Sequence, residues 1–214
     1  MPPTIRPARP SDIPQICSIN THYILNTSLT FVQNPPVAST YLAKYKDLAG
    51  HGLPYLVAVE GDKGHDDGES TELVLGYAYL SPFRGTMISY ASTVELSLYI
   101  RPGSQGQGLG SRLLNAVLDA ARTARHLGWE VTETGSDRDD VHRECASKEK
   151  EDKKVFAVDS EDGGAGARIR SIIAIMAVDP EGPDRGDALR QWYVARGFVE
   201  RGRMEKIGFK RGHW

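Results

Sequence analysis

A glycine-rich segment that follows an alternating segment is the part of this sequence best suited to chemistry. Residues 93–100 alternate between apolar and polar side chains, which is the period of a β-strand. From Leu109 to about Leu127 the apolar residues recur at helical spacing. The glycine run at 105–110 should therefore lie at a helix N-terminus, where bare N–H groups and the positive end of the helix dipole favour a diphosphate.

Two other phosphate-binding motifs do not fit these glycines. A Walker loop ends in Gly-Lys-Ser/Thr, whereas Gly110 is followed by Ser111 and Arg112, and a dinucleotide fingerprint has the spacing G-x-G-x-x-G. The remaining pattern, Gln105-x-x-Gly108-x-Gly110 after a strand, resembles the coenzyme A loop of the GNAT superfamily of acyl-CoA N-acyltransferases. A glycine-rich turn without a ligand is the alternative for this short pattern alone. The residues that the resemblance assigns to acetyl-CoA in this loop are Gln105, Gly106, Gln107, Gly108, Leu109, Gly110 and Ser111.

Composition is that of a small globular enzyme. The 214 residues, of which 40% are hydrophobic, can form one core, and we expect a single domain over residues 1–214. The net charge of −2 and the scattered basic residues do not indicate a nucleic-acid partner. Two cysteines, Cys17 and Cys145, provide neither a disulfide framework nor a metal-ligand set, so we expect no metal and a cytoplasmic protein. The sequence shows no signal peptide and no apolar run long enough to predict a membrane span.

The order of predicted elements gives an α/β fold with a mixed, mostly antiparallel central sheet flanked by helices, which is the GNAT order. The segment 171–178 is apolar on both faces and predicts a central strand. The segment 130–167 is charged and almost free of aromatic residues, which predicts a flexible insertion. The predicted strands are 4–8, 53–60, 73–80, 93–100, 171–178 and 198–204, and the predicted helices are 13–26, 37–48, 109–127 and 187–196.

Four separated segments carry a closer resemblance. Segments 22–31, 76–84, 93–99 and 208–214 are similar to the phosphinothricin and methionine sulfoximine N-acetyltransferases. The resemblance implies transfer of an acetyl group from acetyl-CoA to the α-amino group of a small amino acid or analogue, in a homodimer. Two alternatives remain: an acetyltransferase for another amine, and a non-catalytic acyl-CoA-binding protein with the same fold.

Glu95 is the candidate general base. It lies in the middle of a strand among apolar alternates, and the resemblance places the Glu of a Thr-Val-Glu motif in the active site. The alternative is a glutamate on a solvated strand face. The resemblance also implies that backbone groups of Leu98, Tyr99 and Ile100 pair with the pantetheine arm and that one of their N–H groups stabilises the oxyanion.

Further candidate residues are a general acid and three residues that could line the amine-binding pocket. The segment 192–198 resembles a family motif that places Tyr193 where its hydroxyl can protonate the leaving sulfur, although a packed helix tyrosine is equally compatible with the sequence. Arg84 can bind a carboxylate or phosphinate, and Phe31 and Tyr90 match pocket positions of the family. Core aromatics and a surface arginine are the alternatives for these three.

Two departures from the family pattern lower the expectation of full activity. Gly186 stands where relatives have an asparagine that contacts coenzyme A. Relatives also continue through a further strand, whereas this sequence stops at Trp214, so we expect an incomplete sheet edge.

Overall fold

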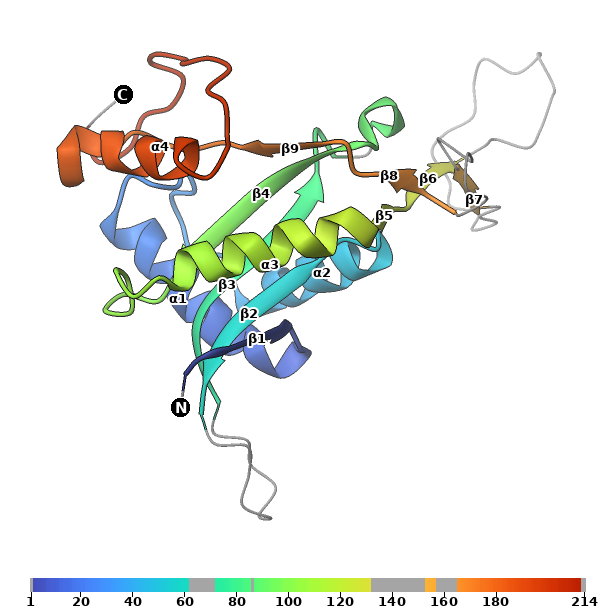
Figure 1. Cartoon of the computed structure of the whole chain (residues 1–214), viewed down its shortest axis with the longest axis horizontal. Coiled ribbons are helices and arrows are strands. Elements are labelled where there is room, and N and C mark those ends of the chain that lie inside the picture. The colour runs from blue at the N-terminus through green and yellow to red at the C-terminus, as the bar shows by residue number, and fades with distance from the viewer. Residues whose placement is uncertain (1, 62–71, 86, 132–152, 157–164, 213–214) are drawn as a thin grey trace, which may run out of the picture.

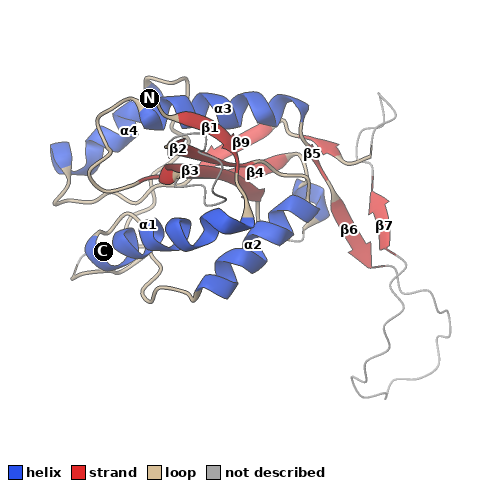
Figure 2. Cartoon of the chain, turned by 90° about the horizontal axis from the view of Figure 1, so that it is seen from below, coloured by secondary structure: helices blue, strands red, loops and turns tan. Residues whose placement is uncertain are grey.

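A five-stranded sheet organises the fold, with strands in the order β1-β2-β3-β4-β9. The computed structural model describes residues 2–61, 72–85, 87–131, 153–156 and 165–212. Helices α3 and α4 lie on one side of the sheet, and α1 and α2 lie on the other (Figures 1 and 2). The strands of this sheet are β1 (Thr4–Pro7), β2 (Tyr55–Glu60), β3 (Leu73–Pro82), β4 (Thr93–Ile100) and β9 (Ser171–Ala174), and the helices are α1 (Ile13–Asn26), α2 (Ala38–Gly50), α3 (Leu109–Thr123) and α4 (Asp187–Val194).

The sheet is mixed, as expected from the order of the elements. Strands β1 to β4 pair antiparallel in succession, and β9 pairs parallel with β4. A parallel neighbour needs a crossover connection, and α3 provides it on one face of the sheet. The predicted fold class is confirmed.

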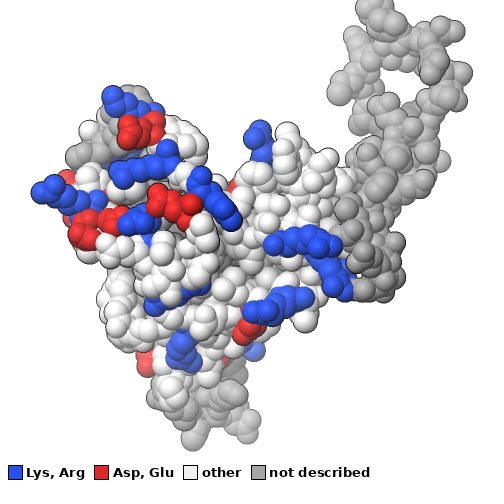
Figure 3. Space-filling model, turned by 45° about the horizontal axis from the view of Figure 1, so that its top comes forward, with Lys and Arg blue, Asp and Glu red and all other residues white. Residues whose placement is uncertain are grey.

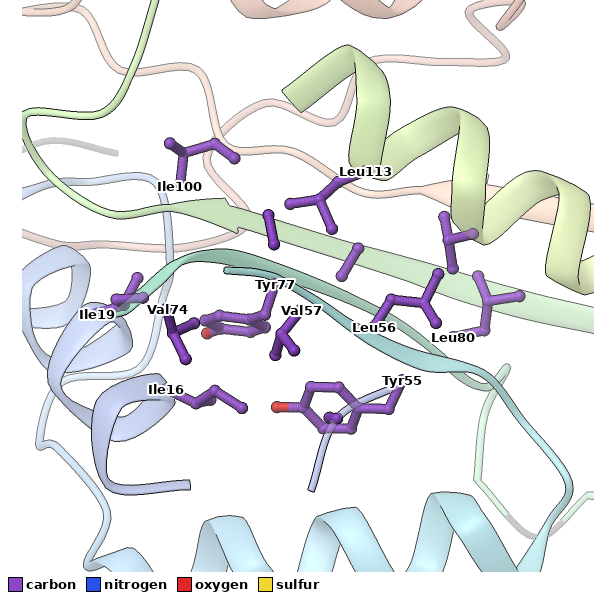
Figure 4. Packing of buried hydrophobic residues seen from close by; sticks show 14 of the residues in the cluster. Ile16, Ile19, Tyr55, Leu56, Val57, Val74, Tyr77, Leu80, Ile100 and Leu113 are labelled. Carbon is purple, nitrogen blue, oxygen red and sulfur yellow. The ribbon is translucent and has the colours of Figure 1, made fainter. Parts of the chain in front are cut away.

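Helix α3 covers one face of the sheet with an apolar stripe, and α1 covers the other. Leu109, Leu113 and Val117 recur at helical spacing along α3, and all three are buried. Figure 4 shows Leu113 on one side of β3 and β4, with Tyr77 and Ile16 on the other side. Burial of each such side chain contributes about 1.5–3 kcal/mol. The sheet is therefore held from both faces along β3 and β4.

Gly76 allows β3 and β4 to approach closely. It lies opposite Ile100, and a Cβ at this position would come within 2.8 Å of the carbonyl oxygen of Tyr99 and of the Ile100 side chain. Glycine is required here because no other residue lacks that atom. The close approach fixes the end of β4 that precedes the glycine loop.

Two strands predicted near the C-terminus, 171–178 and 198–204, are wrong. Strand β9 ends at Ala174 instead of Val178, and it is an edge strand and not a central one. The predicted strand 198–204 does not form, because its apolar residues find no strand to pack on within the described residues: Val199 is 64% exposed and Met204 is 69% exposed. Apolar alternation alone therefore overestimated the sheet.

The segment 130–167 is only partly described. Short strands β6 (Gly128–Val131) and β7 (Lys153–Phe156) pair with each other, and β5 (Arg125–His126) pairs with β8 (Ala167–Arg168). Residues 132–152 and 157–164, which include Cys145, lie outside the described residues. The predicted flexibility of the insertion and its place in a single domain stay predictions. In the parts of the chain that are described, no helix has the length and apolarity needed to cross a bilayer.

Candidate active site

The main-chain N–H and C=O groups of successive β4 residues point alternately to the two neighbouring strands. Arg101 N donates to Leu75 O at 2.7 Å and Phe83 N donates to Thr93 O at 3.3 Å, so the odd-numbered residues of β4 bond to β3. The main-chain groups of the even-numbered residues point the other way, toward the side of β9. Leu98 and Ile100 are among them.

An opening in the sheet begins where β9 leaves β4. Pairing between the two strands ends at Leu96 and Ala174, so Leu98 and Ile100 lie beyond the paired segment. The Tyr23 hydroxyl donates to the carbonyl oxygen of Ile100 at 2.6 Å. The second half of β4 thus presents main-chain groups at a sheet edge that β9 no longer covers.

The glycine loop lies at the end of this open edge and at the start of α3. Gly106 and Gly108 have φ values of 75° and 76°, which favour glycine, and a Cβ on either would meet nothing within 4 Å. Gln105 shapes the loop from within, because its Oε1 accepts from Gly103 N at 2.9 Å and its Nε2 donates to the Tyr23 hydroxyl at 3.2 Å. Bare N–H groups next to a helix N-terminus fit a diphosphate.

The remaining loop residues have different surroundings. Gln107 is exposed, whereas Leu109 is buried and anchors the first turn of α3 in the core. A Cβ on Gly110 would meet the Trp192 ring at 3.4 Å, and the Ser111 hydroxyl accepts hydrogen bonds from Arg196. Helix α4 and the turn that follows it therefore pack directly against the glycine loop.

Glu95 lies in the paired half of β4, on the face of the sheet that α1 and α2 cover. It is half-buried, with Ser81 of β3 and Ile173 of β9 as its cross-strand neighbours. Successive strand residues point to opposite faces, so Glu95 shares its face with Ser97 and Tyr99. The predicted base thus lies on a packed strand, beside the open half.

Tyr193 lies in α4 with its ring packed between Trp192 and Phe198, at centroid distances of 4.9 and 5.1 Å. Burial raises the pKa of Tyr193 to about 12, and the nearby Tyr99 phenol adds to this shift. The hydroxyl therefore keeps its proton at neutral pH, which is the state that a general acid needs.

The predicted pocket residues lie in two neighbourhoods. Arg84 is exposed in the turn after β3 with a φ of 55°, and Tyr90 packs edge-on against Phe83 of the same connection, at 5.3 Å. Both belong to the end of β4 at which Glu95 lies. Phe31 is 49% exposed and belongs to the connection between α1 and α2, where it packs against Gly208.

Hydrogen bonds fasten the C-terminal segment to the connection between α1 and α2. Lys210 Nζ donates to Thr30 O at 2.7 Å, Arg211 Nη1 donates to Leu25 O at 3.0 Å, and Gln33 Nε2 donates to Phe209 O at 3.0 Å. Lys210 is buried, and this burial lowers its pKa. In the sequence this segment carried only the family resemblance. A lysine between Phe209 and Arg211 gave no signal that its ammonium would be buried on a backbone oxygen.

Gly186 leaves no space for the asparagine side chain that the family resemblance implies at this position. Its φ is 86°, and a Cβ would come within 2.6 Å of the carbonyl oxygen of Asp179. The backbone before α4 has closed over the place of an asparagine side chain. This contact to coenzyme A must therefore be absent or come from another residue.

Acidic and basic side chains are interspersed over part of the surface. On the face shown in Figure 3, Lys and Arg side chains are dispersed, and at its left end they lie among Asp and Glu side chains. Arg190, for example, is paired with Asp187 and with Glu200 in the α4 region. Among the described residues, no group of three or more His, Cys, Asp or Glu side chains is arranged to hold a metal ion.

Comparisons with known proteins identify the family of this chain. The model of the acetyltransferase (GNAT) family matches residues 22–146. Phosphinothricin N-acetyltransferase of Alcaligenes faecalis is 35% identical over 115 residues, which is 54% of this chain and 53% of that protein. L-methionine sulfoximine/L-methionine sulfone acetyltransferase of Pseudomonas aeruginosa is 34% identical over 140 residues, 64% of this chain and 74% of that protein. The chain thus spans about half the length of the first of these relatives.

A solved structure shows the same fold. The phosphinothricin acetyltransferase of Sinorhizobium meliloti in complex with AcCoA superimposes with a TM-score of 0.66 at 24% identity, covering 100% of this chain and 84% of that chain. Because the family model covers more than half of the sequence and the fold agrees, the chain belongs to the acetyltransferase (GNAT) family.

Proposed function

We propose that this chain transfers an acetyl group from acetyl-CoA to the α-amino group of a small amino acid or amino-acid analogue. One observation carries the proposal: β4 places a carboxylate, an uncovered main-chain edge and the glycine loop in succession, at Glu95, at Leu98 and Ile100, and at residues 105–110. These are the groups that an acyl-CoA-dependent acylation of an amine requires. Relatives named as amino-acid-analogue acetyltransferases support the substrate class.

The glycine loop and the open edge would hold the acyl-CoA. The loop amides at Gly106 and Gly108 fit the diphosphate because nothing occupies the space in front of them. The main-chain groups of Leu98 and the N–H of Ile100 fit the pantetheine amides, since they point to the open side, whereas the carbonyl oxygen of Ile100 accepts from the Tyr23 hydroxyl. The main-chain groups of Tyr99 bond to β3 and are not free to pair with the pantetheine arm. We therefore assign that pairing to Leu98 and Ile100 and not to Tyr99.

The residues of the chain then divide the reaction among them. Glu95 accepts a proton from the substrate ammonium, so that the neutral amine can attack the thioester carbonyl carbon. An N–H group of the open edge, that of Leu98, stabilises the negative charge that develops on the carbonyl oxygen. Tyr193 donates its proton to the sulfur as the C–S bond breaks, and the second proton that the nitrogen loses as the amide forms replaces the one that Tyr193 gave up. No covalent bond to the enzyme is needed.

The amine pocket would lie between the Arg84 turn and the connection that holds Phe31. The guanidinium of Arg84 suits a carboxylate or phosphinate, and Tyr90 belongs to the same connection between β3 and β4. Phe31 would form the opposite wall, supported from behind by the C-terminal segment. We extend the proposal to a homodimer on the strength of the family resemblance.

The test is acetyl-CoA-dependent thiol release with a panel of amines. Methionine sulfoximine, phosphinothricin, ordinary amino acids, a polyamine and a peptide N-terminus should be compared, with N-acetylated methionine sulfoximine as the blocked control. Release with only the amino-acid analogues supports the proposal, and release with only the polyamine or the peptide replaces the substrate class. If calorimetry shows coenzyme A binding but no amine gives release, the chain is an acyl-CoA-binding protein without turnover.

A further inference from the structure

Arg196 reaches the glycine loop from the turn that follows α4. Its Nε and Nη2 donate to the Ser111 hydroxyl at 3.1 and 2.7 Å, and its Nη1 donates to Trp192 O at 2.8 Å. The guanidinium also lies over the Trp192 ring, 4.1 Å from its centroid. Since the Trp192 ring packs on Gly110, the charged group is fixed at the first turn of α3.

This position is electrostatically unfavourable for a lone cation. The first turn of a helix carries a partial positive charge and favours anions. Among the described residues no carboxylate pairs with Arg196, whose hydrogen bonds go to a hydroxyl and a carbonyl oxygen. Other arginines of the same region are paired with acids, as Arg190 is with Asp187. A bound anion would supply the missing counter-charge to Arg196 and to the helix terminus together.

We propose that Arg196 binds the diphosphate of the acyl-CoA together with the amides of the glycine loop. This inference rests on the proposed function, because it concerns the same cofactor loop. Ser111 holds the guanidinium in place beside the loop, and the Trp192 ring orients it. An arginine fork is well suited to a diphosphate, because it can donate two parallel hydrogen bonds.

The test compares acyl donors with and without the diphosphate. Arg196→Met should lower kcat/KM for acetyl-CoA by about tenfold or more, the loss expected for a charged hydrogen bond. With acetyl-pantetheine, which lacks the diphosphate, the same variant should match the wild type. Acetyl-dephospho-CoA should show the full loss, because it keeps the diphosphate and lacks the 3′-phosphate. Arg196→Lys should restore part of the activity.

Arg112→Met is the matched control. Arg112 follows Ser111 in α3, but it is exposed and donates to Pro3 O at 2.6 Å, away from the loop. The Arg112→Met variant should leave kcat/KM unchanged with all three donors. Equal losses of Arg196→Met with all donors would make Arg196 a packing residue and overturn the inference, and so would the absence of any loss.

Calorimetry separates this inference from the proposed function. The affinity of coenzyme A for Arg196→Met and wild type can be compared even if no amine is acetylated. If the wild type binds coenzyme A without turnover, the proposed activity is wrong, but the contribution of Arg196 to coenzyme A affinity can still be measured. Equal affinity of the two proteins would overturn the contact by itself.

Discussion

The two halves of β4 differ in what lies beside them. From Thr93 to Leu96 the strand is paired on both edges, with β3 and with β9, whereas from Ser97 to Ile100 it is paired with β3 alone. In the first half both main-chain edges are used, so only a side chain such as Glu95 is free to react. In the second half the main chain itself is available. Strand β4 thus carries a candidate reactive side chain, Glu95, in its first half and available main-chain groups in its second half.

The open half is held mainly by contacts of its side chains, and at one point of its free edge the Tyr23 hydroxyl bonds to the carbonyl oxygen of Ile100. Tyr99 stacks on Tyr77 of β3 at 5.4 Å and meets Tyr23 of α1 at 5.2 Å. Gly76 lets β3 approach the main chain of Tyr99 and the side chain of Ile100 closely. These contacts keep the strand extended where β9 has left it, which is the condition for preorganised donors.

The largest expected effect on kcat comes from a substitution in the paired half of β4. Glu95→Gln should lower kcat by about 10²- to 10⁴-fold, because the proton acceptor is lost. Coenzyme A affinity should stay unchanged, since the open half and the loop are intact. Steady-state kinetics and calorimetry measure the two quantities. Glu60→Gln, an exposed glutamate at the end of β2, is the control. An unchanged rate and pH profile would remove Glu95 from the mechanism.

Leu98→Pro tests the open half by deleting one N–H group. Its N–H points away from β3, so proline removes no hydrogen bond of the β3–β4 ladder. We expect kcat/KM for acetyl-CoA to fall by about 10²- to 10³-fold, as for the loss of one oxyanion donor. Ser97→Pro removes an N–H group on the β3 side and should instead lower Tm. Equal behaviour of the two variants in both assays would contradict the assignment of the edges.

Gly76→Ala tests the support behind the open half. The added Cβ would meet the Tyr99 carbonyl oxygen and the Ile100 side chain at 2.8 Å, so the free energy of unfolding should fall by about 1–3 kcal/mol. Denaturant unfolding measures this change. Gly50→Ala is the control, because a Cβ there meets nothing within 4 Å. A fully stable Gly76→Ala protein would show that the two strands can separate at this point without cost.

The smallest effect is expected from Tyr193→Phe, with a decrease in kcat of about tenfold. Burial raises the pKa of Tyr193 from 10.0 to about 12, so its proton is held more tightly in the folded protein. Ionisation of this phenol should therefore not lower kcat of the wild type between about pH 7 and pH 10, whereas it should destabilise the fold as the pH rises from about 10 toward 12. A pH–rate profile and melting curves check both signs. Tyr45→Phe, which removes a hydroxyl that bonds to Ala8 O, is the control. A fall in kcat below pH 10 that disappears in Tyr193→Phe would contradict this pKa.

The sequence pattern predicted best those elements that depend on residues close together in the sequence. Strand β4, the glycine loop and α3 were predicted because alternation, glycine punctuation and helical spacing are short-range signals. The predicted strand at 198–204 failed because strand formation needs a partner, and a sequence pattern does not contain one. Arg196 was missed for a related reason, since Ser111, the partner that holds it at the glycine loop, is 85 residues away in the sequence.

The sequence by itself determined the order of the elements, the glycine loop and the position of Glu95 on an alternating strand. Only the tertiary structure decided that β9 leaves β4 after Leu96, that the even-numbered residues of β4 face the opening, and that Arg196 reaches the loop. The physical reason is that period and turn chemistry act within a few residues, whereas register and docking depend on which distant surfaces bury each other.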